Sequence, residues 1–557
     1  MDARQLSYVE KEQPANTERR LWALLALLIL FLILLILLLL SLGPGRESRY
    51  YVEDEFLVTG PQAEIEDAIA KLREELRAGV TISPIGVPLT LAFPISIPVG
   101  CPGLPPALVE GQEYVISRYR ISGPADVPDI LERLQEITGG GPVQPEPNYL
   151  TGRPPETTQA DPWSIGGSPW SIGGSPWSIG ASPWCVGGSP WSIGGSPWSI
   201  GGSPAGSALL AKGQADFRDQ WAFDEEGINL RAATRGSLSG QGVLVGIFDT
   251  SPFPPTFSHV VIDHLSPLDV GEDRPSFELD LYHPIAGGLH GNPCEVADAR
   301  DHGLYAAGLV HAVAPDSEIR LIRVLDDAGQ GDLQTLNRAL LDFITEVVAR
   351  KGAGEDRVQQ AVQGEPLAGA VINLSLGVHP PPGTVDREQP EEIASLSTIL
   401  SVAQCFNLVT VAAAGNDSAL SDEPLPAQIP AAWSSAIGVA ASNKEGQISC
   451  FSNEGQIMAP GGDGGPRRSD CRPMLHTCED GECPYGLISL SLLSPTGYIY
   501  WHGTSFSAPL VSGWAAVLVQ RGKGELTQDQ VLQEMQASDR PGAEPNLMTI
   551  DVSGSSP

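Results

Sequence analysis

The chain has 557 residues, more than one ordinary hydrophobic core holds, so we expect two folded units joined by connecting segments. Acidic residues outnumber basic residues by 67 to 33, and the formal net charge of −34 argues against a nucleic-acid partner or a general affinity for anionic lipid. No loop has the regular spacing of oxygen ligands that defines a calcium site. The sequence therefore predicts no metal ligand and requires no cofactor, and it leaves a structural calcium ion open.

Residues 21–42 are almost wholly apolar and uncharged, and a helix of that length crosses about 30 Å of hydrocarbon. A cleaved signal peptide would have a shorter apolar core and a small-residue cleavage site, whereas this run is rich in leucine. Lysine and arginine are more frequent before the run than directly after it, which places residues 1–20 in the cytoplasm. We therefore expect a single-pass protein of the cell membrane whose remaining residues lie outside the cytoplasm.

The segment 47–150 is predicted to be a small α+β domain. Its hydrophobic pattern indicates two strands, two amphipathic helices and a short extended end, at residues 51–58, 113–121, 62–76, 126–137 and 143–149. An apolar, proline-rich stretch between the first helix and the second strand is predicted to be irregular.

A seven-residue unit, SPWSIGG with small variations, recurs over residues 161–204. Each unit contains proline and glycine, which exclude a continuous helix and hence a coiled coil. The segment is an extended linker, a tryptophan-rich strip that binds a cell wall, a glycan or a membrane interface, or a stacked array of turns. The sequence does not separate these interpretations.

Residues 210–545 alternate predicted strands with predicted helices, which is typical of an α/β fold with a doubly wound parallel sheet. The predicted strands and the two clearest helices lie at residues 243–248, 319–324, 370–374, 408–413 and 436–440, and at 333–350 and 391–405. Ligands of such sheets bind beyond the carboxyl ends of the strands. Functional residues are therefore expected directly after strands.

Three residues form a constellation that suits nucleophilic catalysis. Asp249 directly follows a buried strand, His302 begins a segment of small residues, and Ser505 lies in GTSFSAP ahead of an apolar run. A serine hydroxyl is a weak nucleophile that needs an imidazole base, and the imidazole needs a carboxylate to hold its tautomer and stabilise its cation. The glycine before Thr504 permits a sharp turn, which presents the hydroxyl at the positive end of a helix.

The blocks VLVGIFDT, HGLYAAGLVHAVAP and GTSFSAPLVSG resemble the three active-site blocks of subtilisin-like serine proteases, in that family's order of Asp, His and Ser. The resemblance covers residues 217–521 and implies a subtilisin-like fold and a serine endopeptidase with the same three residues as its catalytic triad. Ser251 and Leu304 stand where the family usually has glycine and threonine. We expect these departures to alter the local loop geometry without removing a catalytic atom.

Two further blocks resemble the parts of that family that bind substrate. VAAAGN implies that Asn416 donates to the oxyanion of the tetrahedral intermediate, and INLSLG implies a strand on which the substrate backbone pairs by β-augmentation. The substrate-binding residues that the resemblance assigns are Ser375, Leu376, Gly377, Ala413, Ala414 and Gly415.

The segment 47–150 resembles the prodomains of the same family, and VQPEPNY near its end resembles the part that enters the enzyme's cleft. This resemblance implies a zymogen whose prodomain assists folding and inhibits the enzyme until a cut between residues 148 and 161. Because the apolar run at 21–42 precedes the prodomain, such a cut would also release the enzyme from its anchor. Polypeptide substrates, the chain's own prodomain and the membrane are thus the predicted partners.

Two other classes of function are left open. The chain is alternatively an anchored scaffold whose main functional element is the tryptophan-rich repeat, or an inactive binding protein that has kept the fold. Its eight cysteines favour disulfides over a zinc site, because no short C-x-x-C pairs occur, and their pairing is not predicted. Three of them lie in a segment, 460–486, that looks like an insertion.

Overall fold

The computed structural model describes residues 50–98, 100–101, 103–152, 217, 219–223, 239–253, 258–261, 276–282, 299–327, 329–352, 366–378, 393–421, 423–462, 486–492 and 497–537. The predicted cytoplasmic tail and membrane span, the repeat at 161–204 and most of the insertion at 460–486 lie outside the described residues. Within the described ranges, no helix has the length and apolar character needed to span a bilayer.

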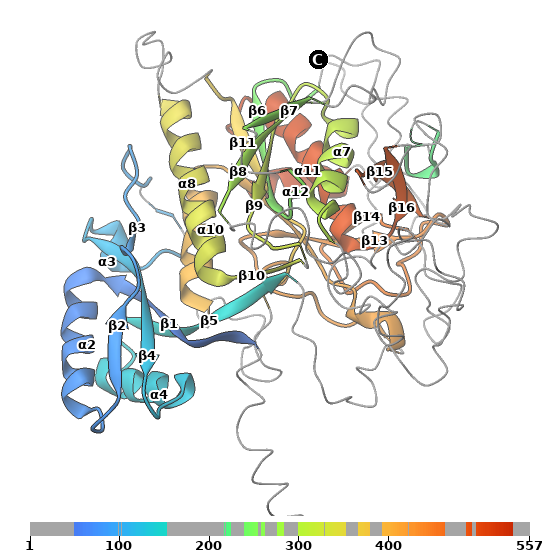
Figure 1. Cartoon of the computed structure of the whole chain (residues 1–557). Coiled ribbons are helices and arrows are strands. Elements are labelled where there is room, and N and C mark those ends of the chain that lie inside the picture. The colour runs from blue at the N-terminus through green and yellow to red at the C-terminus, as the bar shows by residue number, and fades with distance from the viewer. Residues whose placement is uncertain are drawn as a thin grey trace, which may run out of the picture. The chain divides into compact units, whose positions relative to one another are not determined.

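The N-terminal region, residues 50–152, is an antiparallel sheet covered by two helices that pack against each other (Figure 1). Its elements are β1 (Tyr51–Pro61), α2 (Gln62–Glu75), β2 (Thr81–Pro84), β3 (Leu89–Thr90), α3 (Pro106–Val109), β4 (Tyr114–Ser122), α4 (Val127–Thr138) and β5 (Gln144–Gly152). The predicted α+β pattern is confirmed, and the proline-rich stretch adds only short elements. Helix α4 begins where Asp126 accepts a hydrogen bond from the Asp129 N–H, and it ends at Gly139, whose φ is 59°.

The larger region contains an eight-stranded sheet in the order β14-β13-β12-β11-β6-β9-β8-β7. All neighbours are parallel except the edge pair β7 and β8. The strands are β6 (Val243–Asp249), β7 (His259–Val261), β8 (Ser276–Leu281), β9 (Glu318–Arg323), β11 (Gly369–Leu374), β12 (Val409–Ala413), β13 (Ile437–Ser442) and β14 (Ile457–Pro460). The five predicted strands are confirmed. Three others were not predicted: β7 and β14 have only three and four residues, and the alternation of apolar and acidic residues in β8, which is typical of a half-buried strand, was overlooked.

Helices cover both faces of this sheet, as predicted for an α/β fold (Figure 1). Helices α7 (His302–Val313) and α11 (Thr504–Arg521) pack together on one face, and α8 (Leu333–Gly352) and α10 (Ala394–Cys405) on the other. The remaining elements are β10 (Gln330–Asp332), β15 (Leu487–Leu490), β16 (Tyr498–Trp501), α12 (Gln528–Ala537) and the 3-10 turns Trp221–Phe223 and Asp417–Leu420. The carboxyl ends of β6, β11 and β12 therefore meet between the two helical layers.

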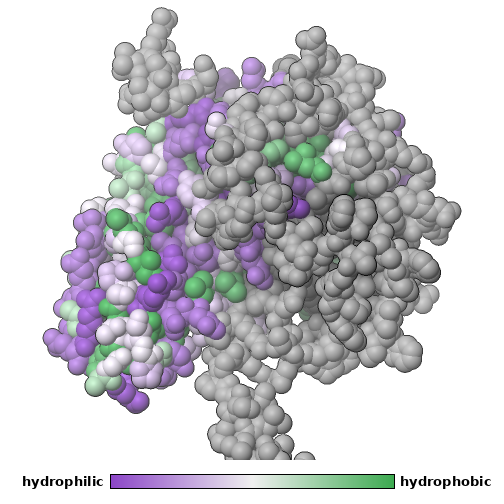
Figure 2. Space-filling model, viewed as in Figure 1, coloured by the Kyte–Doolittle hydropathy of each residue, from purple (hydrophilic) through white to green (hydrophobic). Residues whose placement is uncertain are grey.

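One hydrophobic cluster contains buried residues from both the N-terminal region and the larger region. On the face drawn in Figure 2, the N-terminal region presents mostly hydrophilic residues with small, separate hydrophobic spots. Its exposed large apolar side chains, among the residues described, are Val87, Ile95 and Val109. Most of its apolar surface is thus used in its own core and in the contact with the larger sheet.

Candidate active site

Asp249 and His302 form a buried pair at the carboxyl end of the central strand β6. Strand β6 ends at Asp249 and His302 is the first residue of α7. His302 Nδ1 lies 2.8 Å from each carboxylate oxygen, and both side chains are 0% exposed. A carboxylate only accepts, so Nδ1 carries the proton in this contact and Nε2 is the acceptor of the neutral ring.

A glycine lets helix α7 start against the end of β6. A Cβ atom at Gly303 would lie 2.2 Å from the Thr250 carbonyl oxygen, so the two segments approach as closely as backbone permits. Thr250 also connects them, because its N–H donates to Asp249 Oδ1 at 2.6 Å and its hydroxyl oxygen accepts from the Gly303 N–H at 3.2 Å. Leu304, which departs from the family pattern, is fully buried in the core.

Two other buried histidines have surroundings that keep them neutral. Burial lowers the pKa of His311 to about 4, although Asp316 acts in the opposite direction, and burial lowers the pKa of His502 to about 4. Of His302, His311 and His502, only His302 forms an ion pair with a carboxylate. The structure thus distinguishes His302, as the candidate base, from His311 and His502. In the sequence, only the motif around His302 made this distinction.

Ser505 lies in the first turn of α11, behind Gly503, whose φ is 143°. Its side chain is buried, and its hydroxyl donates to the Ser375 carbonyl oxygen at 3.3 Å. In return, the Ser375 hydroxyl donates to the Ser505 carbonyl oxygen at 2.8 Å. These reciprocal bonds hold the start of α11 against the segment that follows β11.

The structure does not join Ser505 to His302 by a hydrogen bond. His302 Nε2 is buried and has no partner in the described structure, while the Ser505 hydroxyl is used by Ser375. In a free enzyme, the hydrogen-bond distance between the nucleophile and the base is often long, and it shortens when the substrate binds. The two residues are connected through Phe506, the neighbour of Ser505, whose ring centroid lies 5.1 Å from that of His302.

Two aromatic rings pack against the imidazole of His302, and a third packs against both of them. Trp501 meets the imidazole at 85° with centroids 5.4 Å apart, and Phe506 meets it at 48°. Tyr305 packs against both, with centroid distances of 4.4 Å to Phe506 and 5.6 Å to Trp501. Sequence reasoning missed this cluster, and the only signal for it is that Trp501 and Phe506 flank the serine block.

Asn416 follows β12 and lies against the turn before Ser505. Its Oδ1 accepts hydrogen bonds from the Thr504 N–H at 3.0 Å and from the Thr504 hydroxyl at 3.1 Å. Its amide nitrogen has no acceptor among the described residues. Gly415 is required here because its φ is 106° and a Cβ atom would lie 2.7 Å from Asn453 Nδ2. The amide of Asn416 is thus held with a free donor beside the start of α11.

The end of β5 occupies the position predicted for a substrate strand. Residues Leu150 to Gly152 pair antiparallel with β10, and Thr151 forms a bridge with Val378. The Gly152 N–H donates to the Gly377 carbonyl oxygen at 2.8 Å. All three of the predicted binding residues Leu376, Ala413 and Ala414 are buried. Leu376 directly precedes Gly377, whereas Ala413 is the last residue of β12 and Ala414 follows it.

Two residues of β5 also bind the starts of helices α10 and α8. Glu146 Oε1 accepts from the Ser395 N–H at 3.2 Å, and Asn148 Oδ1 accepts from the Gln334 N–H at 3.0 Å. The first-turn N–H groups of a helix have no partner within the helix, which explains both contacts. Burial raises the pKa of Glu146 to about 7, and the hydrogen bonds from Ser395 and Ala394 act in the opposite direction. Sequence reasoning did not single out either side chain.

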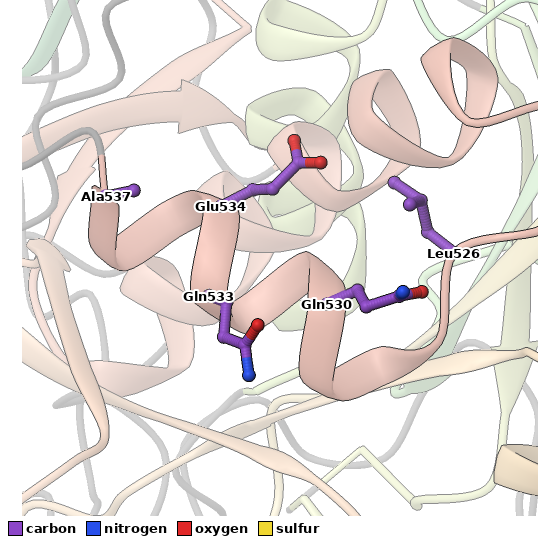
Figure 3. A pocket seen from close by; sticks show the side chains of 5 residues that line it. All are labelled: Leu526, Gln530, Gln533, Glu534 and Ala537. Atoms are coloured by element: carbon purple, nitrogen blue, oxygen red, sulfur yellow. The ribbon is translucent and has the colours of Figure 1, made fainter.

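No other described feature competes with this site. A pocket of about 310 Å³ lies on α12 and the loop before it, where its lining side chains come from Leu526, Gln530, Gln533, Glu534 and Ala537 (Figure 3). None of these side chains is a base paired with a carboxylate or a nucleophile. Within the described residues, no group of three or more His, Cys, Asp or Glu side chains is placed to hold a metal ion.

Comparison with known proteins agrees with this geometry. The sequence is 26% identical over 261 residues to the minor extracellular protease Epr of Bacillus subtilis (strain 168), covering 44% of this chain and 31% of that protein. It is 25% identical over 280 residues to the thermophilic serine proteinase of Bacillus sp. (strain AK1), covering 48% of this chain and 54% of that protein. The matches thus span about a third and about half of these two relatives.

Among solved structures, a protease of Pseudoalteromonas arctica PAMC 21717 matches with 22% identity and a TM-score of 0.40, covering 62% of this chain and 98% of that one. The family profile for subtilases matches residues 240–548, which is more than half of the sequence and includes Asp249, His302, Asn416 and Ser505. The chain therefore belongs to the subtilase family.

Proposed function

We propose that the chain is a serine endopeptidase that hydrolyses peptide bonds of polypeptide substrates through an acyl-enzyme intermediate. The observation that carries this proposal is the buried Asp249 and His302 pair, with both carboxylate oxygens 2.8 Å from Nδ1. That contact leaves Nε2 as a proton acceptor in a ring that packs against Phe506, the neighbour of Ser505. The two similar proteins, which are named as proteases, also support the proposed peptidase activity.

In the first half of the proposed reaction, Ser505 Oγ attacks the scissile carbonyl carbon while His302 Nε2 takes the hydroxyl proton. Asp249 keeps the imidazole in the required tautomer and stabilises the cation. The carbon–nitrogen bond then breaks, and the imidazolium returns its proton to the leaving amine. In the second half, water repeats the attack with His302 as base and frees the acid and Ser505.

The negative oxygen of each tetrahedral intermediate needs donors that are already in place. Asn416 Nδ2 is one candidate, because its Oδ1 is held by Thr504 and its amide nitrogen is unused in the described structure. The Ser505 N–H is the other, because it lies in the first turn of α11 where helix N–H groups lack intrahelical acceptors. A donor of this kind contributes about 10²- to 10³-fold to kcat in related chemistry.

We further propose that the N-terminal region is an inhibitory prodomain. Its strand β5 lies between β10 and the segment after β11, so a substrate strand and β5 compete for the same backbone partners. The contacts of Glu146 and Asn148 with α10 and α8 add to this binding. The intact chain is therefore a zymogen.

We also propose that residues 21–42 anchor this zymogen in the cell membrane, with residues 1–20 in the cytoplasm. The support is the uncharged apolar run and the excess of basic residues before it. The seven-residue repeat then connects the prodomain to the enzyme.

The activity is tested by comparing the wild-type chain with Ser505→Ala on a casein-like substrate and by labelling with a serine-directed phosphonate. We expect Ser505→Ala to lose both hydrolysis and labelling, because the nucleophile is removed. Ser434→Ala is the matched control, since Ser434 is exposed and lies before β13, at the end of the sheet opposite to the triad. Equal labelling of the wild type and Ser505→Ala would refute the mechanism.

A further inference from the structure

A disulfide bond between Cys101 and Cys405 joins the N-terminal region to the larger α/β region. Their Cα atoms are 5.5 Å apart, a separation typical of disulfides. Cys405 is the last residue of helix α10, whose first turn binds Glu146 of β5. The bond therefore lies at the end of α10 away from the proposed active site.

Noncovalent contacts around the bond hold the same two surfaces together. The rings of Phe93 and Phe406 pack with centroids 5.5 Å apart. Gly103 approaches α10 so closely that a Cβ atom would lie 3.2 Å from Ser401 Oγ. The N-terminal region thus contacts α10 at both ends, and the two cysteines meet in a position that packing has already defined.

We infer that this disulfide keeps the N-terminal region attached to the enzyme after the chain is cut, so that release of the inhibitor requires a thiol reductant. The inference rests on the proposed function, in which the cut lies beyond β5. Cys101 precedes any such cut and Cys405 follows it, 304 positions later, so the two products remain one molecule. Dissociation is then opposed by an effective concentration on the order of millimolar.

Release is a thiol–disulfide exchange with a dithiol as the reductant. One sulfur of the dithiol attacks one sulfur of the bond, and the other cysteine leaves as a thiolate that takes up a proton. The second sulfur of the dithiol closes a cyclic disulfide and frees the remaining cysteine as a thiol. Cys101 and Cys405 together gain two electrons and two protons, which the dithiol loses. Outside the cytoplasm disulfides persist, so the attached state is the resting state there.

The test uses the full chain with Ser505→Ala and a recognition sequence for a site-specific protease inserted within residues 161–204. After cutting, the protein is separated on denaturing gels with and without dithiothreitol. We expect one species of full-length size without the reductant and two fragments with it. Two fragments without the reductant would overturn the inference. Because an external protease makes the cut, this result is independent of the proposed activity, which the comparison of wild type with Ser505→Ala tests separately.

A second measurement uses the matured wild-type protein and the double variant Cys101→Ser/Cys405→Ser, assayed with a small peptide substrate over a roughly hundredfold dilution. The oxidised wild type should keep a low specific activity at every concentration, because its inhibitor cannot diffuse away. The double variant keeps the noncovalent contacts but should gain specific activity on dilution without reductant. The same dilution behaviour in both proteins would contradict the inference. If the double variant fails to fold, the gel experiment decides alone.

Discussion

The imidazole of His302 is surrounded by rings and by one carboxylate, with no exposed surface of its own. In the proposed acyl transfer this ring becomes a cation, which Asp249 stabilises directly. A ring face within about 6 Å of a cation adds roughly 0.5 to 2 kcal/mol. The rings of Trp501 and His302 meet at 85° with centroids 5.4 Å apart, and we expect this contact to help hold and stabilise the charged imidazole.

Replacing Trp501 tests this role. We expect Trp501→Leu to lower kcat by about 2- to 30-fold with little change in KM, because the ring acts on the imidazolium and not on bound substrate. Trp501→Phe keeps an aromatic ring and should recover most of the activity. Thermal unfolding first gives a temperature at which both variants are folded. Steady-state kinetics at that temperature then separate this role from a loss of stability. Equal losses of kcat in Trp501→Leu and Trp501→Phe would argue against this role of the ring.

Among the elements, strand β5 contacts the larger region in two ways, through its backbone and through its side chains. Its end pairs with β10 and with the segment after β11, and its side chains bind the starts of α8 and α10. Asn148 is also bonded to Glu55, which two arginines of β4 neutralise. Glu146 has no arginine partner in the described structure and binds the start of α10 instead, so we expect it to make docking depend on pH.

The pKa of Glu146 is raised from 4.5 to about 7 by burial, so docking favours its protonated form. The contribution of Glu146 to the stability of the docked state is fully present below about pH 4.5 and is lost as the pH rises through about 7. We expect hydrogen-exchange protection of residues 144–152 in the full chain with Ser505→Ala to fall between pH 5 and pH 9, after correction for intrinsic exchange. Adding Glu146→Gln should flatten this dependence, whereas Glu136→Gln, on the exposed side of α4, should leave it unchanged. A pH profile that Glu146→Gln does not alter would rule out this residue as the cause.

At the scale of the whole molecule, the hydrophobic cluster shared by both regions and the Cys101–Cys405 bond make the N-terminal region part of one compact unit. A cut that removes the peptide connection would leave both of these links. The proposed anchor at residues 21–42 would then stay attached to the enzyme through the disulfide. This changes the expectation from sequence, in which the cut alone releases the enzyme from the membrane.

In the proposed maturation, the cut lies beyond the paired end of β5. Residues Leu150 to Gly152 pair with β10, and Thr151 and Gly152 also bind the segment after β11. We expect N-terminal sequencing of the active protein to show a new N-terminus within residues 153–161, together with a second sequence from the attached N-terminal region. Active enzyme with residue 1 as its sole N-terminus would refute the maturation scheme.

Much of the fold was predictable because buried parallel strands have a local signature. Strand β6 is a continuous apolar run, and α8 has a clear helical period. Strand β8 alternates apolar and acidic residues, a period-2 signature that sequence reasoning passed over, whereas β7 and β14 are too short to show a period. The site residues were found from their motifs, because Asp249, His302 and Ser505 each stand beside a glycine or a strand end that the chemistry needs.

The family, the order of the catalytic candidates and the α/β pattern can be predicted from local motifs and periodicity, because these depend on residues that are neighbours along the chain. Contacts between distant residues arise only when the chain folds. Folding brought Trp501 against His302, Glu146 against the start of α10, and Cys101 to Cys405. The last pair is separated by 304 positions, and no local pattern indicates which of eight cysteines will meet. Their pairing is set by how two regions pack, which is a property of the folded chain alone.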